Sequence, residues 1–392
     1  MVATFLGLGG LLPAISSAAP VAPGYRAFTG FCLALFLVYV GTVVLRISID
    51  TSIFIVVGLA VLGAGRLALI VGRKNGLAQL LVHPVFLLVV GIAVVAQYQG
   101  EITYHPYGFD TYANWLIRAK KLWLANDLLA PVTADGGSGY VPGWHLMLMF
   151  TAPLFQEFDS LYAIAAPIGI HVVLLAVVYD VAVHWWCSEL GGKARDAVVV
   201  GWALILVALA GEAAWTLLPT VILAEIPLFY TLIGVFALAT MYWHRESSRP
   251  AVTLALGLAI SAHYLIKKSG LAGIPVGLGL VFAGYALNKS RDSIPLARVV
   301  VYVLIAAGPA VISVFAWKLA GVTSTKCVDS LGGLLFSADQ YSTAMERIVP
   351  LAGDLISATG NYTSGYKFPL TLVALGGVAV GMFEARTRWI SV

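Results

Sequence analysis

About ten apolar runs, each close to the roughly twenty residues that a helix needs to cross a bilayer, dominate this chain and restrict its fold class. Hydrophobic residues make up 60% of the sequence and charged residues 11%, whereas soluble domains carry about 25% charged residues. The sequence therefore predicts an all-α, polytopic membrane protein with about 10–11 transmembrane helices. The runs lie at roughly 28–47, 52–72, 79–98, 160–187, 197–218, 222–243, 251–267, 269–287, 297–320 and 366–383.

Lysine and arginine placement predicts the orientation of these helices. If the loop at Arg73 and Lys74 is cytoplasmic, alternation places most other basic loops on the same side, including "GGKARD" (191–196) and "NKSRDS" (288–293). The first large loop and the loop 321–365 then lie on the outer side. Residues 5–20 form a weak, proline-interrupted apolar segment, which we interpret as interfacial.

This topology divides the chain into five parts. They are N-terminal transmembrane helices (1–98), an outer loop with interfacial helices (99–159), a transmembrane core (160–320), a second outer loop (321–365), and a last transmembrane helix with a cytoplasmic tail (366–392). The alternation requires that the short run 143–156 does not span the membrane, so we expect a surface-lying or re-entrant helix there.

The first outer loop contains an amphipathic pattern between Tyr112 and Leu124. Trp115, Leu116, Ala119, Leu122 and Trp123 fall on one stripe, and Arg118, Lys120 and Lys121 flank it. Such a pattern is typical of a helix in the headgroup layer, and a simple anchor explains it as well as a binding site does.

Asp110 precedes this helix, where a carboxylate can cap the N-terminus. It also lies beside the aromatic side chains of Tyr104, His105, Tyr107 and Phe109. A carboxylate in this setting can act as a general base at the lipid–water boundary, while the aromatic rings stack on sugars and the nearby cations bind a lipid-linked phosphate.

Two further elements reach the predicted outer side. Glu225 stands in an apolar context near the start of one span, where a carboxylate either reaches water or has a function. Lys267 and Lys268 follow a short span, against the positive-inside trend, and either snorkel to headgroups or bind a phosphate.

Four stretches, taken in order, resemble motifs of GT-C superfamily integral-membrane glycosyltransferases, in particular family-39-like enzymes that use polyprenyl-phosphate sugars. These stretches are "FDTYANWLIRAKKLW" (109–123), "GYVPGWHLMLMF" (139–150), "AEIPLFYTLIG" (224–234) and "IKKSGL" (266–271). The resemblance covers roughly residues 79–290. It implies a GT-C-like fold, and sugar transfer from a polyprenyl-phosphate donor to an acceptor at the outer membrane face.

Residue roles follow from the same resemblance. It implies catalytic roles for Asp110 and Glu225, with Asp110 deprotonating the acceptor or binding a divalent cation such as Mg²⁺ or Mn²⁺. The predicted substrate-binding residues are Tyr104, His105, Trp115, Arg118, Lys120, Lys121, Tyr140, His145, Lys267 and Lys268. No Cys/His spacing in the sequence indicates a metal centre of its own.

The predicted location is a bacterial inner membrane, with the functional face periplasmic or extracellular. The expected partners are the lipid-linked sugar, membrane lipids and other membrane proteins. The small net charge of +4 argues against nucleic-acid binding. Two other functions stay open: a non-catalytic GT-C-like scaffold or lipid-binding subunit, and a transporter, for which Asp180 and His171 are the main intramembrane candidates.

Overall fold

The structure is a computed structural model, in which the chain divides into two compact units, Met1–Thr325 and Lys326–Val392. The described residues all lie in the first unit. They are 1–14, 22–73, 83, 115–129, 141–188, 196, 198–199, 201–202, 225–242, 249–267, 270–271, 273–288 and 295–323.

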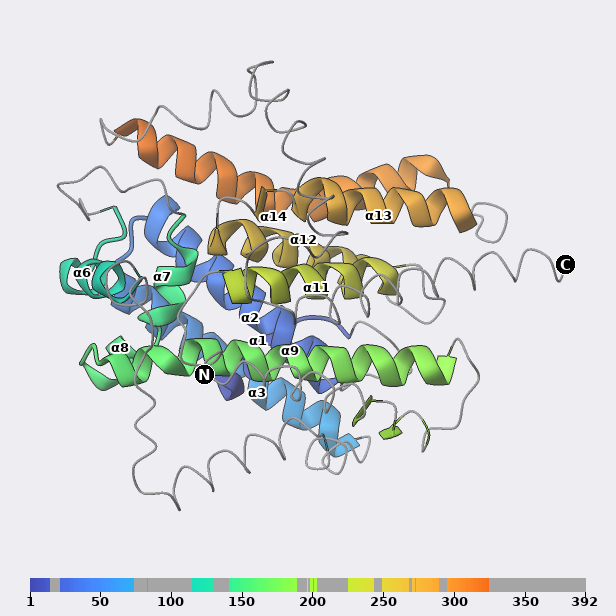
Figure 1. The fold of residues 1–392 in the computed structure, drawn as a ribbon, viewed down its shortest axis with the longest axis horizontal. Coiled ribbons are helices and arrows are strands. Elements are labelled where there is room, and N and C mark those ends of the chain that lie inside the picture. Colours follow the sequence, from blue (N-terminus) through green and yellow to red (C-terminus); the bar gives the residue numbers. More distant parts are fainter. Residues whose placement is uncertain are drawn as a thin grey trace, which may run out of the picture. The chain divides into compact units, whose positions relative to one another are not determined.

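These residues form helices and no strand (Figure 1), which confirms the all-α fold class for the described part of the chain. The helices are α1 (Val2–Leu11), α2 (Pro23–Tyr39) with its π-helical extension η1 (Val40–Val44), α3 (Ile49–Arg73), α6 (Ile117–Ala125), α7 (Gly143–Leu148), α8 (Ala152–Phe155), α9 (Ser160–Ser188), α11 (Glu225–Met241), α12 (Arg249–Ile266), α13 (Gly273–Asn288) and α14 (Leu296–Thr323).

Five spans within the described residues are long and apolar enough to cross a membrane: Pro23–Val44, Ile49–Gly72, Ala166–Val183, Arg249–Ile266 and Leu296–Trp317. The protein is therefore a multi-pass membrane protein. The expected spans 222–243 and 269–287 correspond to the shorter helices α11 and α13. The expected span 366–383, the span 79–98 apart from His83, and most of the span 197–218 lie outside the described residues.

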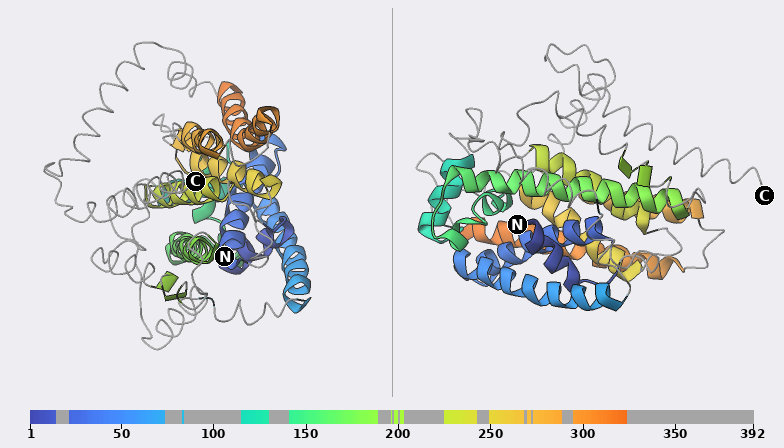
Figure 2. Two further views of the ribbon diagram at one scale, coloured as in Figure 1. Left: turned by 90° about the vertical axis from the view of Figure 1, so that its right-hand side faces the viewer. Right: turned by 90° about the horizontal axis from the view of Figure 1, so that it is seen from below.

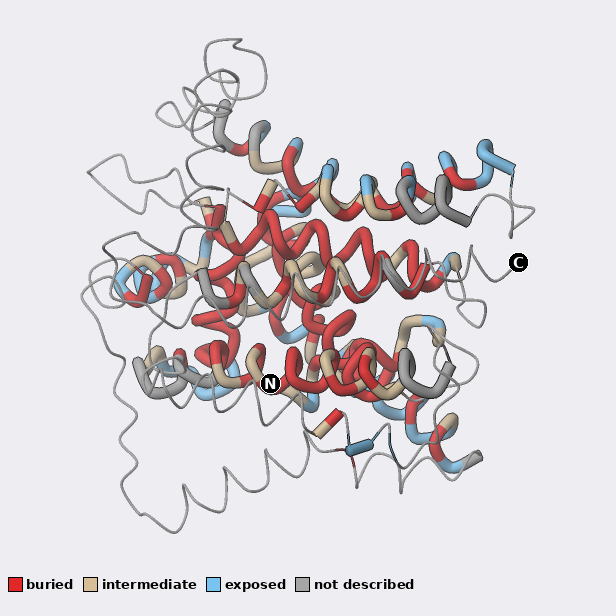
Figure 3. The backbone as a smooth tube through the Cα atoms, turned by 45° about the vertical axis from the view of Figure 1, so that its right-hand side comes forward, coloured by how far each residue is buried: buried red, intermediate tan, exposed pale blue. Residues whose placement is uncertain are grey.

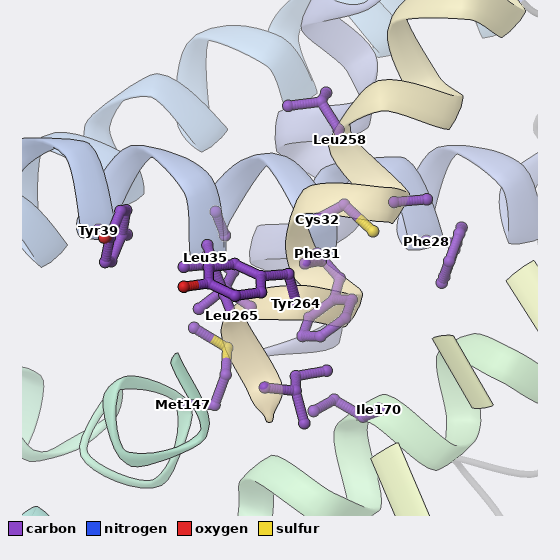
Figure 4. Close-up of a cluster of buried hydrophobic side chains, with 14 of the residues drawn as sticks. Phe28, Phe31, Cys32, Leu35, Tyr39, Met147, Ile170, Leu258, Tyr264 and Leu265 are labelled. Atoms are coloured by element: carbon purple, nitrogen blue, oxygen red, sulfur yellow. The ribbon is translucent and has the colours of Figure 1, made fainter. Parts of the chain in front are cut away.

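α12 lies at the centre of the assembly, where it contacts α2, α7, α11, α13 and α14. Buried residues make up 83% of its span, compared with 28% for the spans in α3 and α14. Figure 3 shows the same gradient, with buried backbone in the middle and exposed residues on the peripheral helices. The central cluster in Figure 4 combines Phe31 and Leu35 of α2, Met147 of α7, Ile170 of α9 and Leu265 of α12.

Polar side chains inside the helical assembly join neighbouring helices. Thr231 Oγ1 lies 2.9 Å from His263 Nδ1, and Ser261 Oγ lies 2.7 Å from Ser313 Oγ. The Tyr39 hydroxyl donates to the backbone oxygen of Ser313 at 2.8 Å. Such bonds orient helices where the surroundings offer no water as a partner.

α1 is a core element, and it contains residues 5–11 of the segment 5–20 that we interpreted as interfacial. Phe5 and Leu8 are fully buried, and α1 packs against both α2 and α3. A Cβ atom on Gly9 would collide with the Arg26 backbone oxygen, and one on Gly30 would collide with that of Phe5, so glycines allow this close approach.

Arginine side chains complete the C-terminal end of α1. The buried Arg26 guanidinium donates to the Gly9 oxygen at 2.8 Å and to the Leu12 oxygen at 3.3 Å, and Arg66 donates to the Leu11 oxygen. These bonds satisfy carbonyl groups that a helix end leaves without partners.

The run 143–156 is not among the described spans that are long and apolar enough to cross a membrane. It forms two short helices, α7 and α8, separated by Met149–Thr151, rather than one surface helix. Every residue of α7 is buried, and Gly143 packs against the Leu265 backbone of α12. α7 therefore does not lie on the surface of the protein, because it packs against α2, α6, α9 and α12.

Candidate functional site

The candidate site is at one end of the helical assembly, which we name the α6 end. It contains the link from η1 to α3, the helices α6, α7 and α8, and the last turn of α12 (Figures 1 and 2). Several residues that are far apart in the sequence lie close together at this end.

α6 is fixed to the first turn of α3 through Asn126. The Asp50 backbone N–H donates to Asn126 Oδ1 at 3.1 Å, and Asn126 Nδ2 donates to Asp50 Oδ2 at 3.2 Å. The Ile49 N–H also points to the Asn126 backbone oxygen at 3.5 Å. Asn126 ends α6 with a φ of 50°, a left-handed conformation that asparagine adopts more readily than most residues.

The two faces of α6 have different surroundings. Trp115, Leu116, Ala119 and Leu122 are buried and belong to the main hydrophobic cluster. The predicted stripe is therefore confirmed, and it faces the interior of the protein. The expectation that α6 lies in the headgroup layer stays a prediction. The exposed face carries Lys120 and Lys121, whereas Arg118 is half-buried at the edge between the two faces.

α7 places His145 against α6. The rings of Trp115 and His145 are 5.2 Å apart at an interplanar angle of 38°, and the His145 side chain is 3% exposed. His145 Nε2 and the neighbouring Trp144 Nε1 are buried, and within the described part of the chain neither atom has a hydrogen-bond partner. Such atoms destabilise a fold unless a ligand or an ordered water binds them, so they indicate a place where a polar group can bind.

Burial, and to a smaller extent the positive charge of Arg118, lower the pKa of His145 to about 3. His145 is therefore neutral at physiological pH. A neutral imidazole can accept a hydrogen bond at one nitrogen and donate one at the other, which suits an uncharged hydroxyl group better than it suits a second cation.

Lys267 and the start of α11 lie at the same end. Lys267 is half-buried and follows the last residue of α12, two positions after Leu265, which packs on Gly143 of α7. α11 begins at Glu225, fewer than two turns before Thr231, which contacts His263 near the end of α12. The backbone of Glu225 is thus at the α6 end, and its side chain is not among those that the structure describes.

The structure brings together three of the predicted site residues, Trp115, Arg118 and His145. Lys267 follows the last turn of α12 at the same end, and the backbone of Glu225 begins α11. Lys120 and Lys121 are at the same end but on the outward face of α6. The remaining predicted site residues, Asp110, Tyr104, His105, Tyr140 and Lys268, lie outside the described residues. The roles of all these residues stay predictions.

Two residues at the α6 end escaped the sequence reasoning. Arg46 was included in the apolar run 28–47, but the helix ends at Val44, and Arg46 is exposed with a φ of 56°. Asp50 anchors α6 through its hydrogen bond with Asn126. Its position just before an apolar run indicated a helix start, because acidic residues are common there.

The intramembrane candidates for transport have structural partners. The Asp180 carboxylate accepts from the backbone N–H groups of Gly24 and Tyr25, at 2.6 and 3.2 Å, and lies 3.2 Å from His83 Nε2. The His171 ring packs against Tyr230 at 5.4 Å. In the described ranges no group of three or more His, Cys, Asp or Glu side chains is arranged to bind a metal ion.

No protein-family model matches this chain, and no curated protein or solved structure matches it either.

Proposed function

We propose that this protein is a membrane glycosyltransferase of GT-C type that moves a sugar from a polyprenyl-phosphate donor to an acceptor at the α6 end, which we take as the outer membrane face. The contact between Trp115 and His145 carries this proposal. It joins the amphipathic-helix motif (109–123) to the "GYVPGWH" motif (139–145), two of the stretches on which the resemblance rests.

The described side chains suit the parts of such a donor. Arg118 and Lys267 supply positive charge for the phosphate, and charge stabilisation is usually the largest contribution to catalysis. Trp115 is buried against the neutral His145, and the unpartnered Nε2 of His145 can bond to a sugar hydroxyl. The unpartnered Nε1 of Trp144 beside it also supports a polar ligand at this position.

In the proposed reaction the acceptor oxygen attacks the anomeric carbon of the sugar. The bond between that carbon and the phosphate oxygen breaks, and the polyprenyl phosphate leaves with the electron pair. Asp110 takes the acceptor proton, or binds a divalent cation such as Mg²⁺ or Mn²⁺, which would supply charge stabilisation at the phosphate. Glu225 is the second proposed catalytic carboxylate.

Sugar transfer in isolated membranes, with a labelled lipid-linked sugar as donor, tests the proposal. We expect Asp110→Asn to reduce transfer by at least about a hundredfold, and Arg118→Gln to raise KM for the donor. Arg298→Gln, an exposed arginine on α14, is the matched control and should have no effect. Unchanged transfer by Asp110→Asn would contradict the catalytic assignment and favour the non-catalytic scaffold.

A further inference from the structure

The exposed face of α6 has a regular composition. Ile117, Lys120, Lys121 and Leu124 follow one another at the spacing i, i+3, i+4, i+7, so they form one stripe. Ile117 is 48% exposed and Leu124 is 66% exposed. Two lysines between two exposed aliphatic side chains form a surface that is apolar at its ends and positive in its middle, and α6 itself contains no acidic residue.

The depth of this stripe in the membrane follows from the Asp50–Asn126 hydrogen bonds. Asp50 is in the first turn of α3, whose membrane-spanning segment begins at Ile49. Asn126 immediately follows α6, so the C-terminal end of α6 is level with the first turn of a spanning helix. That level is the boundary between hydrocarbon and headgroups.

The link between η1 and α3 adds a second positive group at this boundary. Val44 and Leu45 are 49% and 62% exposed, and Arg46 follows them, three residues before Ile49. An arginine beside exposed aliphatic side chains at the end of a spanning helix can extend its guanidinium to the lipid phosphates.

We propose that residues 44–46 and the stripe 117/120/121/124 together form a headgroup-binding collar for anionic phospholipids of the bilayer. Arg46, Lys120 and Lys121 bind the lipid phosphates, and Leu45, Ile117 and Leu124 insert between the acyl chains. The collar uses the face of α6 opposite Trp115, so it is separate from the site that contains His145. It does not depend on the proposed sugar transfer.

Photo-crosslinking in nanodiscs tests the collar. The full-length protein is placed in phosphatidylcholine nanodiscs that contain a trace of photoactivatable phosphatidylglycerol or photoactivatable phosphatidylcholine. Mass spectrometry then measures the crosslink yield on the peptides that contain residues 44–46 and 117–124. We expect the phosphatidylglycerol yield to exceed the phosphatidylcholine yield by about fivefold or more, and high salt to remove the difference.

Substitutions show whether the collar residues cause the preference for phosphatidylglycerol. Arg46→Gln/Lys120→Gln/Lys121→Gln should bring the two yields to parity, whereas Arg298→Gln and Asp110→Asn should leave the ratio on these peptides unchanged. The substituted residues are exposed, so the triple variant should fold, and size-exclusion chromatography checks this. Equal yields in the wild type, or an unchanged ratio in the triple variant, would overturn the collar.

The same nanodiscs distinguish bulk lipid from the sugar donor. Unlabelled phosphatidylglycerol should compete for the crosslink on α6, and polyprenyl phosphate at equal concentration should compete no better. Stronger competition by polyprenyl phosphate would assign Lys120 and Lys121 to the donor and overturn the collar.

Discussion

The carboxylate of Asp180, on α9, accepts a 2.6 Å hydrogen bond from the backbone N–H of Gly24, in the first turn of α2. The same oxygen accepts from the N–H of Tyr25, and the other carboxylate oxygen lies 3.2 Å from His83 Nε2. A negative charge at the start of a helix also interacts favourably with the helix dipole. Asp180 therefore caps α2 from a distant part of the chain, and this structural role accounts for a carboxylate inside the membrane domain.

Asp180→Ala is expected to destabilise the protein, because it leaves two N–H groups of α2 without an acceptor. The expected loss is about 2 kcal/mol or more, and Asp180→Asn should lose less, because its amide oxygen can still accept a hydrogen bond. Unfolding by SDS in mild detergent measures both values. Glu157→Gln, at an exposed acidic position, is the control. A stable Asp180→Ala variant would contradict the capping role and return Asp180 to the transport hypothesis.

The glycines of α1 and α3 give a matched test of helix packing. Gly9→Ala would place a Cβ against the Arg26 backbone oxygen, which cannot move without shifting α2, so we expect a loss of about 3 kcal/mol or more. Gly58→Ala, on α3, would meet nothing within 4 Å and should change stability by less than about 1 kcal/mol. Fluorescence-detected thermal unfolding compares the two. Equal midpoints would show that α1 does not pack as described.

The sequence predicted which residues of α6 share a face, but not what that face contacts. Helical periodicity depends on the backbone and can be read from spacing, and the stripe of Trp115, Leu116, Ala119 and Leu122 follows it. Protein interior and lipid are both apolar, so composition cannot distinguish a stripe that packs on α7 from one that enters the bilayer.

The contacts between residues far apart in the chain could not be predicted from the sequence, for a different reason. Asp50 and Asn126 are separated by 76 residues, and Asp180 and Gly24 by 156, so no local pattern connects them. The grouping of Arg118, His145 and Lys267 at one end was predictable, because helix alternation fixes the end to which each residue belongs. The contact between Trp115 and His145 needed the tertiary structure.

The pair Ser261–Ser313 provides a test of polar contacts between α12 and α14. Ser261→Ala removes an interhelical hydrogen bond of 2.7 Å and should destabilise the protein by about 0.6 kcal/mol. Thr253→Val, on the same helix, replaces a buried hydroxyl that has no hydrogen-bond partner among the described residues. This control should be neutral or slightly stabilising. Unfolding midpoints in SDS compare the two, and a larger loss for Thr253→Val would contradict the assigned contacts.

His145 should make stability depend on pH. Burial lowers its pKa in the folded protein from 6.5 to about 3, so the unfolded chain binds a proton below pH 6.5 that the folded protein does not bind. Stability is therefore highest above pH 6.5 and falls as the pH drops from 6.5 towards 3, by about 1.4 kcal/mol for each pH unit. Thermal unfolding in detergent at a series of pH values across this range measures the slope.

Replacing His145 isolates its contribution to that slope. His145→Gln keeps a polar side chain that does not titrate, so its stability should fall less steeply on acidification than that of the wild type. His171→Gln, in which the replaced histidine packs on Tyr230, should retain the slope that His145 contributes. If the wild type and His145→Gln lose stability in parallel, the imidazole is accessible to protons in the folded state. The buried placement of His145 against Trp115 would then be wrong.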